Sequence, residues 1–293
     1  MFCIHGIAPV VDRERFLHRN LLPAAALEAY LAGAAPFVTI AEALAGRGNA
    51  LTIDDATRAG ADAALMARAA GHEVTLFVNP GQVESGAPYH FLLLNALLDQ
   101  VTGASVEFER TNYPIGTTSE HQALRRVIKD RLRSLTSEEA RRELVQQLAQ
   151  SWRAGPLDVG APFATLSREA LSGLLAAGVE LQNHGWSHAF HPALSPPESA
   201  VEVSRGREWL RQEFGVDARW FAAPFGDSLP HDVALDCDLW FAFNSEWAEG
   251  AIAGGVFNRV DLPVPSPEKP LLRRATAALR GLATRVSGAL RQQ

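Results

Sequence analysis

Short apolar runs alternate along this chain with longer segments of helical periodicity, and this alternation constrains the fold more than any other feature. The strand-like runs lie near residues 2–7, 50–53, 73–78, 178–183, 218–223 and 239–244, with a weaker one near 256–260. Helical periodicity covers residues 57–70, 90–101, 121–135, 137–152, 167–177, 197–214 and 231–236. A β/α succession of this kind predicts a parallel sheet covered by helices.

The stretch from about residue 82 to 160 interrupts this alternation. It is helical by pattern, rich in Arg, Gln and Glu, and contains no recognisable strand. We therefore expect a helical insertion, which could be a lid, an oligomer arm or a substrate-facing subdomain. The simplest interpretation is a solvated helical hairpin packed on the side of the main domain.

A proline-rich joint separates the last part of the chain, with Pro263, Pro265, Pro267 and Pro270 close together. We expect a main domain over residues 1–267 and a basic amphipathic helix over residues 268–293. Six basic residues against Glu268 give this tail a net charge of +5, which leaves −11 for the preceding 267 residues. Residues 268–293 could make a weak contact with an anionic membrane surface or a protein, although such helices more often close their own domain.

Composition excludes several classes of protein. The chain has 293 residues and a net charge of −6, which argues against nucleic acid as a partner. Cys3 and Cys237 are the two cysteines, so neither a disulfide framework nor a zinc knuckle is expected. The sequence contains no secretory signal and no apolar run of transmembrane length, and we expect a cytoplasmic protein.

Chemically active residues recur where a predicted strand ends. Asp54 and Asp55 follow the run over residues 50–53, His184 and His188 follow another, and residues 223–226 (Ala-Pro-Phe-Gly) follow a third. Active sites of parallel α/β barrels assemble at this end of the strands. One carboxylate and two imidazoles suit a divalent metal ion, and the second carboxylate is left to move protons. Each motif alone is weak, because an Asp pair is more often a helix cap and a His pair is often part of a turn.

Taken together, these motifs resemble those of polysaccharide deacetylases, carbohydrate esterase family 4. The segment Thr52-Ile53-Asp54-Asp55-Ala56 is similar to their Thr-Phe-Asp-Asp-Gly motif, and residues 184–188 are similar to their His-Ser/Thr-x-x-His motif. Residues 221–226 resemble their Arg-Pro-Pro-Tyr-Gly loop. The resemblance implies an α/β fold, a distorted (β/α) barrel with about seven parallel strands, and removal of an acetyl group from an N-acetylated saccharide or glycan precursor.

The resemblance also implies roles for single residues. Asp55, His184 and His188 would bind one divalent ion, with zinc expected and cobalt or nickel as alternatives. A water molecule on that ion would be the nucleophile, and Asp54 would be the general base. The backbone N–H of Phe225 would stabilise the oxyanion.

Other residues are expected to face the substrate. Pro224 and Gly226 would shape the loop around Phe225, and Trp186 could stack on a sugar ring. The general acid is expected to be His5, which is similar to a histidine on the first strand of circularly permuted members. His231 and His191 are weaker alternatives, and His5 could instead be a hydrogen-bonded structural histidine.

Three positions depart from the family pattern. Gly185 replaces a Ser or Thr, Ala56 replaces a Gly, and Ala222 stands where an arginine would pair with the base. We expect Arg58 or Arg259 to supply the missing charge beside Asp54.

Two further functions remain open at this point. A carbohydrate-binding relative that has lost catalysis would explain the changes at Gly185 and Ala222. A hydrolase of small cyclic or linear amides could use the same scaffold. The presence of all three expected metal ligands together with the base favours the deacetylase.

Overall fold

The apolar runs of the sequence form the strands of one main sheet. The computed structural model describes residues 1–226, 236–243, 250–252 and 256–262. The strands are β1 (Phe2–Ile4), β4 (Leu51–Asp54), β5 (Val74–Val78), β8 (Glu180–Asn183), β9 (Trp220–Ala222), β10 (Leu239–Ala242), β11 (Gly250–Ile252), β12 (Val256–Asn258) and β13 (Val260–Asp261). Their order is β11-β12-β10-β9-β8-β5-β4-β1-β13, and only β11 pairs antiparallel, with β12.

Arg259 alone separates β12 from β13, and this short stretch nearly closes the sheet. β12 pairs with β10 near one end of the sheet, whereas β13 pairs with β1 at the other. If β12 and β13 are counted as one interrupted strand, the barrel has seven parallel strands. The distorted barrel predicted from the sequence is therefore confirmed, and Arg259 lies at its closing point.

Six of the seven predicted helices are present among the described residues with small shifts at their ends, and three further helices were not predicted. The helices are α1 (Ala24–Gly33), α2 (Ile40–Leu44), α3 (Arg58–Ala69), α4 (Pro80–Ser85), α5 (His90–Gln100), α6 (Thr118–Arg133), α7 (Glu138–Ser151), α8 (Arg168–Ala176) and α9 (Pro196–Phe214). The described residues also form three single turns of 3-10 helix, η1 (Ala161–Phe163), η2 (His191–Ala193) and η3 (Pro224–Gly226). Thr57, Ser137 and Ser167 cap α3, α7 and α8 with their hydroxyls, as polar residues before helices do.

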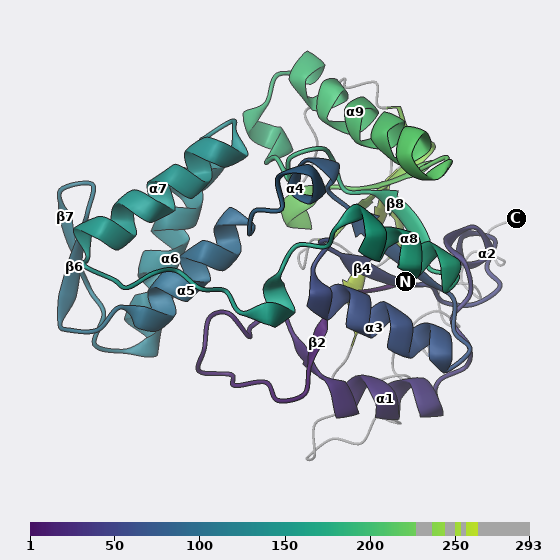
Figure 1. The fold of residues 1–293 in the computed structure, drawn as a ribbon, viewed down its shortest axis with the longest axis horizontal. Helices are drawn as coiled ribbons and strands as arrows, with labels where there is room; N and C mark the ends of the chain where they lie inside the picture. The colour runs from purple at the N-terminus through teal and green to yellow at the C-terminus, as the bar shows by residue number, and fades with distance from the viewer. Residues whose placement is uncertain (227–235, 244–249, 253–255, 263–293) are drawn as a thin grey trace, which may run out of the picture. The chain divides into compact units, whose positions relative to one another are not determined.

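The two faces of the strands bury different kinds of side chain. Ile53, Leu76 and Leu181 belong to the large apolar core, to which α3 and α8 also contribute (Figure 1). Alternate residues of the same strands point the other way, and Thr52 and Asp54 contact Arg259. Because side chains alternate along a strand, the apolar core and the ion pair lie on opposite faces of β4.

The strand predicted over residues 2–7 was wrong in one respect, because it is broken at Gly6. β1 stays in the main sheet, whereas β2 (Ile7–Ala8) pairs with β3 (Leu22–Pro23) in a separate parallel pair. Gly6 has φ of +148°, and a Cβ at this position would lie 2.7 Å from Ala59. The close approach of α3 therefore requires glycine here.

The insertion contains a strand pair that the sequence did not indicate. β6 (Ser105–Phe108) and β7 (Thr111–Pro114) form an antiparallel hairpin, so the prediction of a purely helical segment was wrong. Its turn residues, Glu109 and Arg110, both have positive φ. Such turns usually carry Asn or Gly, and because neither residue is present the sequence contains no signal for a hairpin here.

The insertion has a core of its own rather than only a solvated surface. Leu94, Leu124 and Val145, from α5, α6 and α7, are fully buried in one cluster. Phe16 and Leu17 of the N-terminal loop (residues 9–20) join the same cluster. Figure 1 shows these helices grouped beside the β6–β7 hairpin.

Several predictions concern residues outside the part of the chain described here. The helix expected over residues 231–236 falls there almost entirely, as does the basic helix over residues 268–293. The proposed boundary at residue 267 stays a prediction. Among the described helices, none combines the length and apolarity needed to cross a membrane.

Candidate metal centre

The two aspartates lie at the end of β4, where the chain turns into α3. Asp54 is the last residue of the strand, and Asp55 follows with φ of 69°. The turn is short because the Thr57 N–H donates to the Asp55 carbonyl oxygen, while the Thr57 hydroxyl caps α3. A non-glycine residue in the left-handed region carries strain, which often accompanies functional sites. The turn aims the two carboxylates in different directions.

The two histidines lie on the loop after β8, and buried polar contacts hold this loop. The amide of Asn79 donates to the carbonyl oxygens of His184 and Gly185. The carboxylate of Glu202 on α9 accepts hydrogen bonds from the backbone and the hydroxyl of Ser187. Burial raises the pKa of Glu202, which these hydrogen bonds only partly offset.

Three side-chain atoms converge at this site, one from each of Asp55, His184 and His188. The Oδ1 atom of Asp55 lies 3.6 Å from His184 Nε2 and 3.4 Å from His188 Nε2, and it has no hydrogen-bond partner although it is buried. Two ligands about 2.1 Å from one ion at a tetrahedral angle would lie about 3.4 Å apart. The donor set and its spacing therefore fit a divalent metal ion.

The surroundings of the two imidazoles differ. Burial lowers the pKa of His184, but the carboxylates of Asp54 and Asp55 outweigh it and raise that pKa above its ordinary value. His184 Nδ1 lies 2.8 Å from the carbonyl oxygen of Ala222. A proton on Nδ1 satisfies that carbonyl and leaves Nε2 free toward Asp55. Burial, reinforced by nearby positive charges, lowers the pKa of His188 well below its ordinary value. Ala222 thus contributes to the site through its backbone.

Asp54 forms a two-pronged ion pair with Arg259. The guanidinium Nη1 and Nη2 atoms each lie 2.7 Å from a carboxylate oxygen of Asp54, and Arg259 is only 1% exposed. Burial alone would raise the pKa of Asp54, but the Arg259 charge outweighs it and holds that pKa well below the ordinary value. Of the two arginines suggested by the sequence, Arg58 instead pairs with Asp62 on the protein surface.

The loop after β9 brings a backbone turn to the same place. Phe225 has φ of 64°, and its ring centroid lies 4.9 Å from that of His188. Gly226 has φ of 70°, and a Cβ there would meet the carbonyl group of Phe243. This turn, which begins at Pro224, holds the Phe225 ring against the His188 imidazole.

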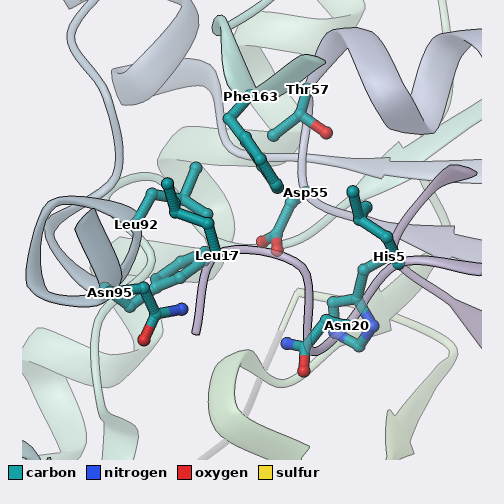
Figure 2. A pocket seen from close by; sticks show the side chains of 10 residues that line it. His5, Leu17, Asn20, Asp55, Thr57, Leu92, Asn95 and Phe163 are labelled. Atoms are coloured by element: carbon teal, nitrogen blue, oxygen red, sulfur yellow. The ribbon is translucent and has the colours of Figure 1, made fainter. Parts of the chain in front are cut away.

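A pocket opens against Asp55 and contains His5 (Figure 2). It encloses about 350 Å³, including its opening to solvent. The strand ends supply His5, Asp55 and Thr57, whereas α5 supplies Asn95. His5 is half-buried. The remaining lining residues are Asn20, followed by the apolar Leu17, Leu21, Phe91, Leu92 and Phe163.

Two other residues suggested by the sequence have different surroundings. The Arg205 guanidinium lies 3.6 Å from the ring centroid of Trp186, and Gly81 packs against the indole, so Trp186 lies between α4 and α9. His191 is buried and contacts the Ser199 hydroxyl through Nδ1. Burial lowers the pKa of His191 to about 3, which makes it a poor proton donor. His231 lies outside the described residues.

A buried ionic cluster of His90, Glu138 and Arg141, which the sequence patterns did not indicate, lies next to His188. Glu138 of α7 accepts from His90 Nδ1 at 2.7 Å and from the His90 backbone N–H at 2.9 Å. Arg141, one turn along, contacts Glu138 and donates to the carbonyl oxygen of His188 at 3.4 Å. These charges fall inside a segment with ordinary helical patterning, so only their burial sets them apart.

Tyr89 supports the site through its hydroxyl, a role that the sequence did not indicate. Its hydroxyl donates to Asn79 Oδ1 and accepts from the backbone N–H of Ala56. It therefore connects the turn at Asp55 with the residue that supports the His184 loop.

Solved structures of other proteins are similar to this chain. The deacetylase PplD of Streptococcus pyogenes, solved in complex with acetate, is 15% identical, with 91% of this chain and 93% of that chain covered and a TM-score of 0.52. IcaB from Ammonifex degensii is 17% identical over 91% of each chain, with a TM-score of 0.47. No curated protein matches the chain.

A match to a family model identifies the family more directly than these structural similarities do. The model described as polysaccharide deacetylase matches residues 44–236, which is more than half of the chain and spans both the aspartates and the histidines. The chain therefore belongs to the polysaccharide deacetylase family.

Proposed function

We propose that this protein is a metal-dependent hydrolase that removes an acetyl group from an N-acetylated saccharide or glycan precursor. The observation that carries the proposal is the convergence of Asp55, His184 and His188 at distances suited to one ion, beside the Asp54–Arg259 pair. We expect zinc, because its sites favour imidazole and carboxylate ligands, with cobalt or nickel as alternatives. A divalent ion at these ligands supplies a Lewis acid and lowers the pKa of water toward about 7.

Asp54 is the proposed general base. Its carboxylate stays ionised because Arg259 lowers its pKa, so it can accept a proton from the attacking water. The same pairing makes the carboxylate a weak base, and its contribution therefore depends on the acidity of that water. Arg259 also restricts the orientation of the carboxylate through two hydrogen bonds. Asp54 therefore has an arginine partner although Ala222 stands at the position of the family's arginine.

The later steps need an oxyanion donor and an acid. The Phe225 backbone N–H is the proposed donor, and the turn through Gly226 supports its position. His5 is the proposed acid for the leaving amine, because it lines the same pocket as Asp55. For Trp186 we favour a packing role, given its contacts with Gly81 and Arg205.

We further propose a carbohydrate as the partner in the pocket and the cytoplasm as the compartment. Cys3 and Cys237 are both free, in keeping with a reducing environment. A precursor assembled inside the cell is then a more natural substrate than a finished external polymer.

Metal analysis combined with acetate release tests this function. Purified full-length protein should contain about one divalent ion per chain and release acetate from N-acetylated sugars, with loss of release on chelation and recovery with zinc. Bound metal without acetate release from any N-acetylated sugar would favour a carbohydrate-binding relative. Turnover confined to small cyclic or linear amides would favour the amide hydrolase, and absence of metal binding would reject the proposal.

A further inference from the structure

Two arginines that adjoin pocket-lining residues have no carboxylate partner among the described residues. Arg125 lies on α6 and Arg19 on the N-terminal loop, where its guanidinium lies 4.2 Å from the ring centroid of Phe16. Burial, together with the charge of Arg19, lowers the pKa of Arg125 to about 10. Two neighbouring cations without a counter-ion are unfavourable, and a partly buried one is more so. An anion bound between them would relieve this cost.

Asn95 connects Arg125 to the pocket. Arg125 Nε donates to Asn95 Oδ1 at 2.8 Å, which orients the amide and leaves its NH₂ group without a partner among the described residues. Asn95 is 4% exposed and lines the pocket that contains Asp55. Asn20, the neighbour of Arg19 in the chain, lines the same pocket. Figure 2 shows Asn20 and Asn95 on the side of the pocket away from Thr57 and Phe163.

The nearest acidic side chain on α5 is already engaged. Asp99, one turn after Asn95, accepts hydrogen bonds from the backbone N–H groups of Phe16 and Leu17. It also forms an ion pair with Arg15. Asp99 therefore fixes the N-terminal loop against α5 and does not neutralise Arg19 or Arg125.

We propose that Arg125 and Arg19, with Asn95 and Asn20, form a subsite for an anionic group of the substrate, a phosphate or a carboxylate. This inference rests on the proposed function, and it narrows the substrate class to acidic or phosphorylated N-acetylated sugars. Guanidinium groups bind both anions through paired N–H donors, and amide NH₂ groups add neutral donors. The insertion and the N-terminal loop would then select the substrate, while the strand ends carry out the chemistry.

Binding of deacetylated sugars tests the subsite separately from catalysis. Zinc-loaded full-length protein is titrated by calorimetry with glucosamine 1-phosphate, muramic acid and glucosamine, none of which retains an acetyl group to remove. We expect at least one anionic sugar to bind about tenfold more tightly than glucosamine, and this preference should weaken as salt is raised. The anionic sugar that binds more tightly shows whether phosphate or carboxylate is the recognised group.

Variants assign the preference to the subsite. Arg125→Gln and Arg19→Gln should each reduce it about tenfold, whereas Arg126→Gln, an exposed neighbour on α6, should leave it unchanged. If Arg125→Gln folds poorly by circular dichroism, Arg19→Gln carries the test. Equal affinity of the wild-type protein for all three sugars, or an unchanged preference in both variants, overturns the inference. Acetate release without anion preference contradicts the subsite alone, and anion preference without acetate release contradicts the proposed function alone.

Discussion

The ion pair between Asp54 and Arg259 is the most specific contact at the scale of single residues. Both partners are buried, and the two hydrogen bonds engage both carboxylate oxygens. Replacing Arg259 with Gln would leave a buried carboxylate without its charge partner, which costs about 3–5 kcal/mol. Urea unfolding of Arg259→Gln should report that loss, and acetate release should fall as well.

Arg58→Gln is the matched control for Arg259→Gln, because Arg58 forms an exposed pair with Asp62. Its unfolding free energy should stay within about 0.5 kcal/mol of wild type. In the double variant Asp54→Asn/Arg259→Gln, the loss should be smaller than the sum of the single losses, since the two residues act as one unit. Strict additivity would show that the pair contributes little.

Gly226 provides a second prediction at this scale. Its φ of 70° and the closeness of the Phe243 carbonyl group leave no room for a Cβ. Gly226→Ala should therefore shift the turn that holds Phe225 and reduce kcat by about tenfold or more, as loss of an oxyanion donor does. Gly86→Ala provides a comparison, since that residue also has positive φ but a Cβ there meets no atom within 4 Å. Equal kcat values for the two variants would contradict the role of the turn.

Most residues of the candidate site could be predicted from the sequence, but the residues that hold them in position could not. Asp55, His184 and His188 follow strands whose ends meet, so the fold class alone brings them together. Arg259 was one of two candidates, because nothing local relates residue 259 to residue 54. Closure of the barrel between β12 and β13 creates that contact.

At the scale of elements, α7 links the insertion to the candidate metal centre through Glu138 and Arg141. Burial would raise the pKa of Glu138, but His90 and Arg141 outweigh it and lower that pKa below its ordinary value of 4.5. The folded state thus binds this proton more weakly than the unfolded chain. The resulting stability is present above about pH 4.5 and is lost as pH falls through the folded pKa.

Glu138→Gln should destabilise the protein by about 3 kcal/mol at pH 7. The difference from wild type should shrink as pH falls below 4.5, because wild-type Glu138 then becomes protonated and uncharged. Urea unfolding of both proteins across this pH range measures the difference. Glu139→Gln, on the exposed side of α7, is the control. A gap between wild type and Glu138→Gln that is constant with pH would contradict the assignment.

Secondary structure was easiest to predict where periodicity and caps agree. The α3, α7 and α8 helices begin next to Thr57, Ser137 and Ser167, which cap them. The β6–β7 hairpin was missed because Glu109 and Arg110 are unusual residues for its turn. The short β2–β3 pair depends on a tertiary contact at Gly6, which no local pattern encodes.

At the scale of the whole molecule, three distant parts of the chain line one pocket. Leu17 comes from the N-terminal loop, Asp55 from the barrel and Asn95 from the insertion. Metal bound at Asp55 should therefore stabilise more than the loops that hold it. At a free zinc concentration about a thousandfold above Kd, the gain is about 4 kcal/mol. Chelation should lower the melting temperature in calorimetry, and His188→Ala should remove the effect; an unchanged melting temperature would contradict metal binding.

The division of labour between the adjacent aspartates is the central claim, and parallel assays of Asp54→Asn and Asp55→Asn test it most directly. Metal content per chain and acetate release are measured on both variants and on wild type. Asp54→Asn should keep about one ion and lose about 10²–10⁴-fold in kcat, as expected for a missing base. Asp55→Asn should lose the ion together with activity. Loss of metal from Asp54→Asn with retention by Asp55→Asn, or full activity of either variant, would contradict the account.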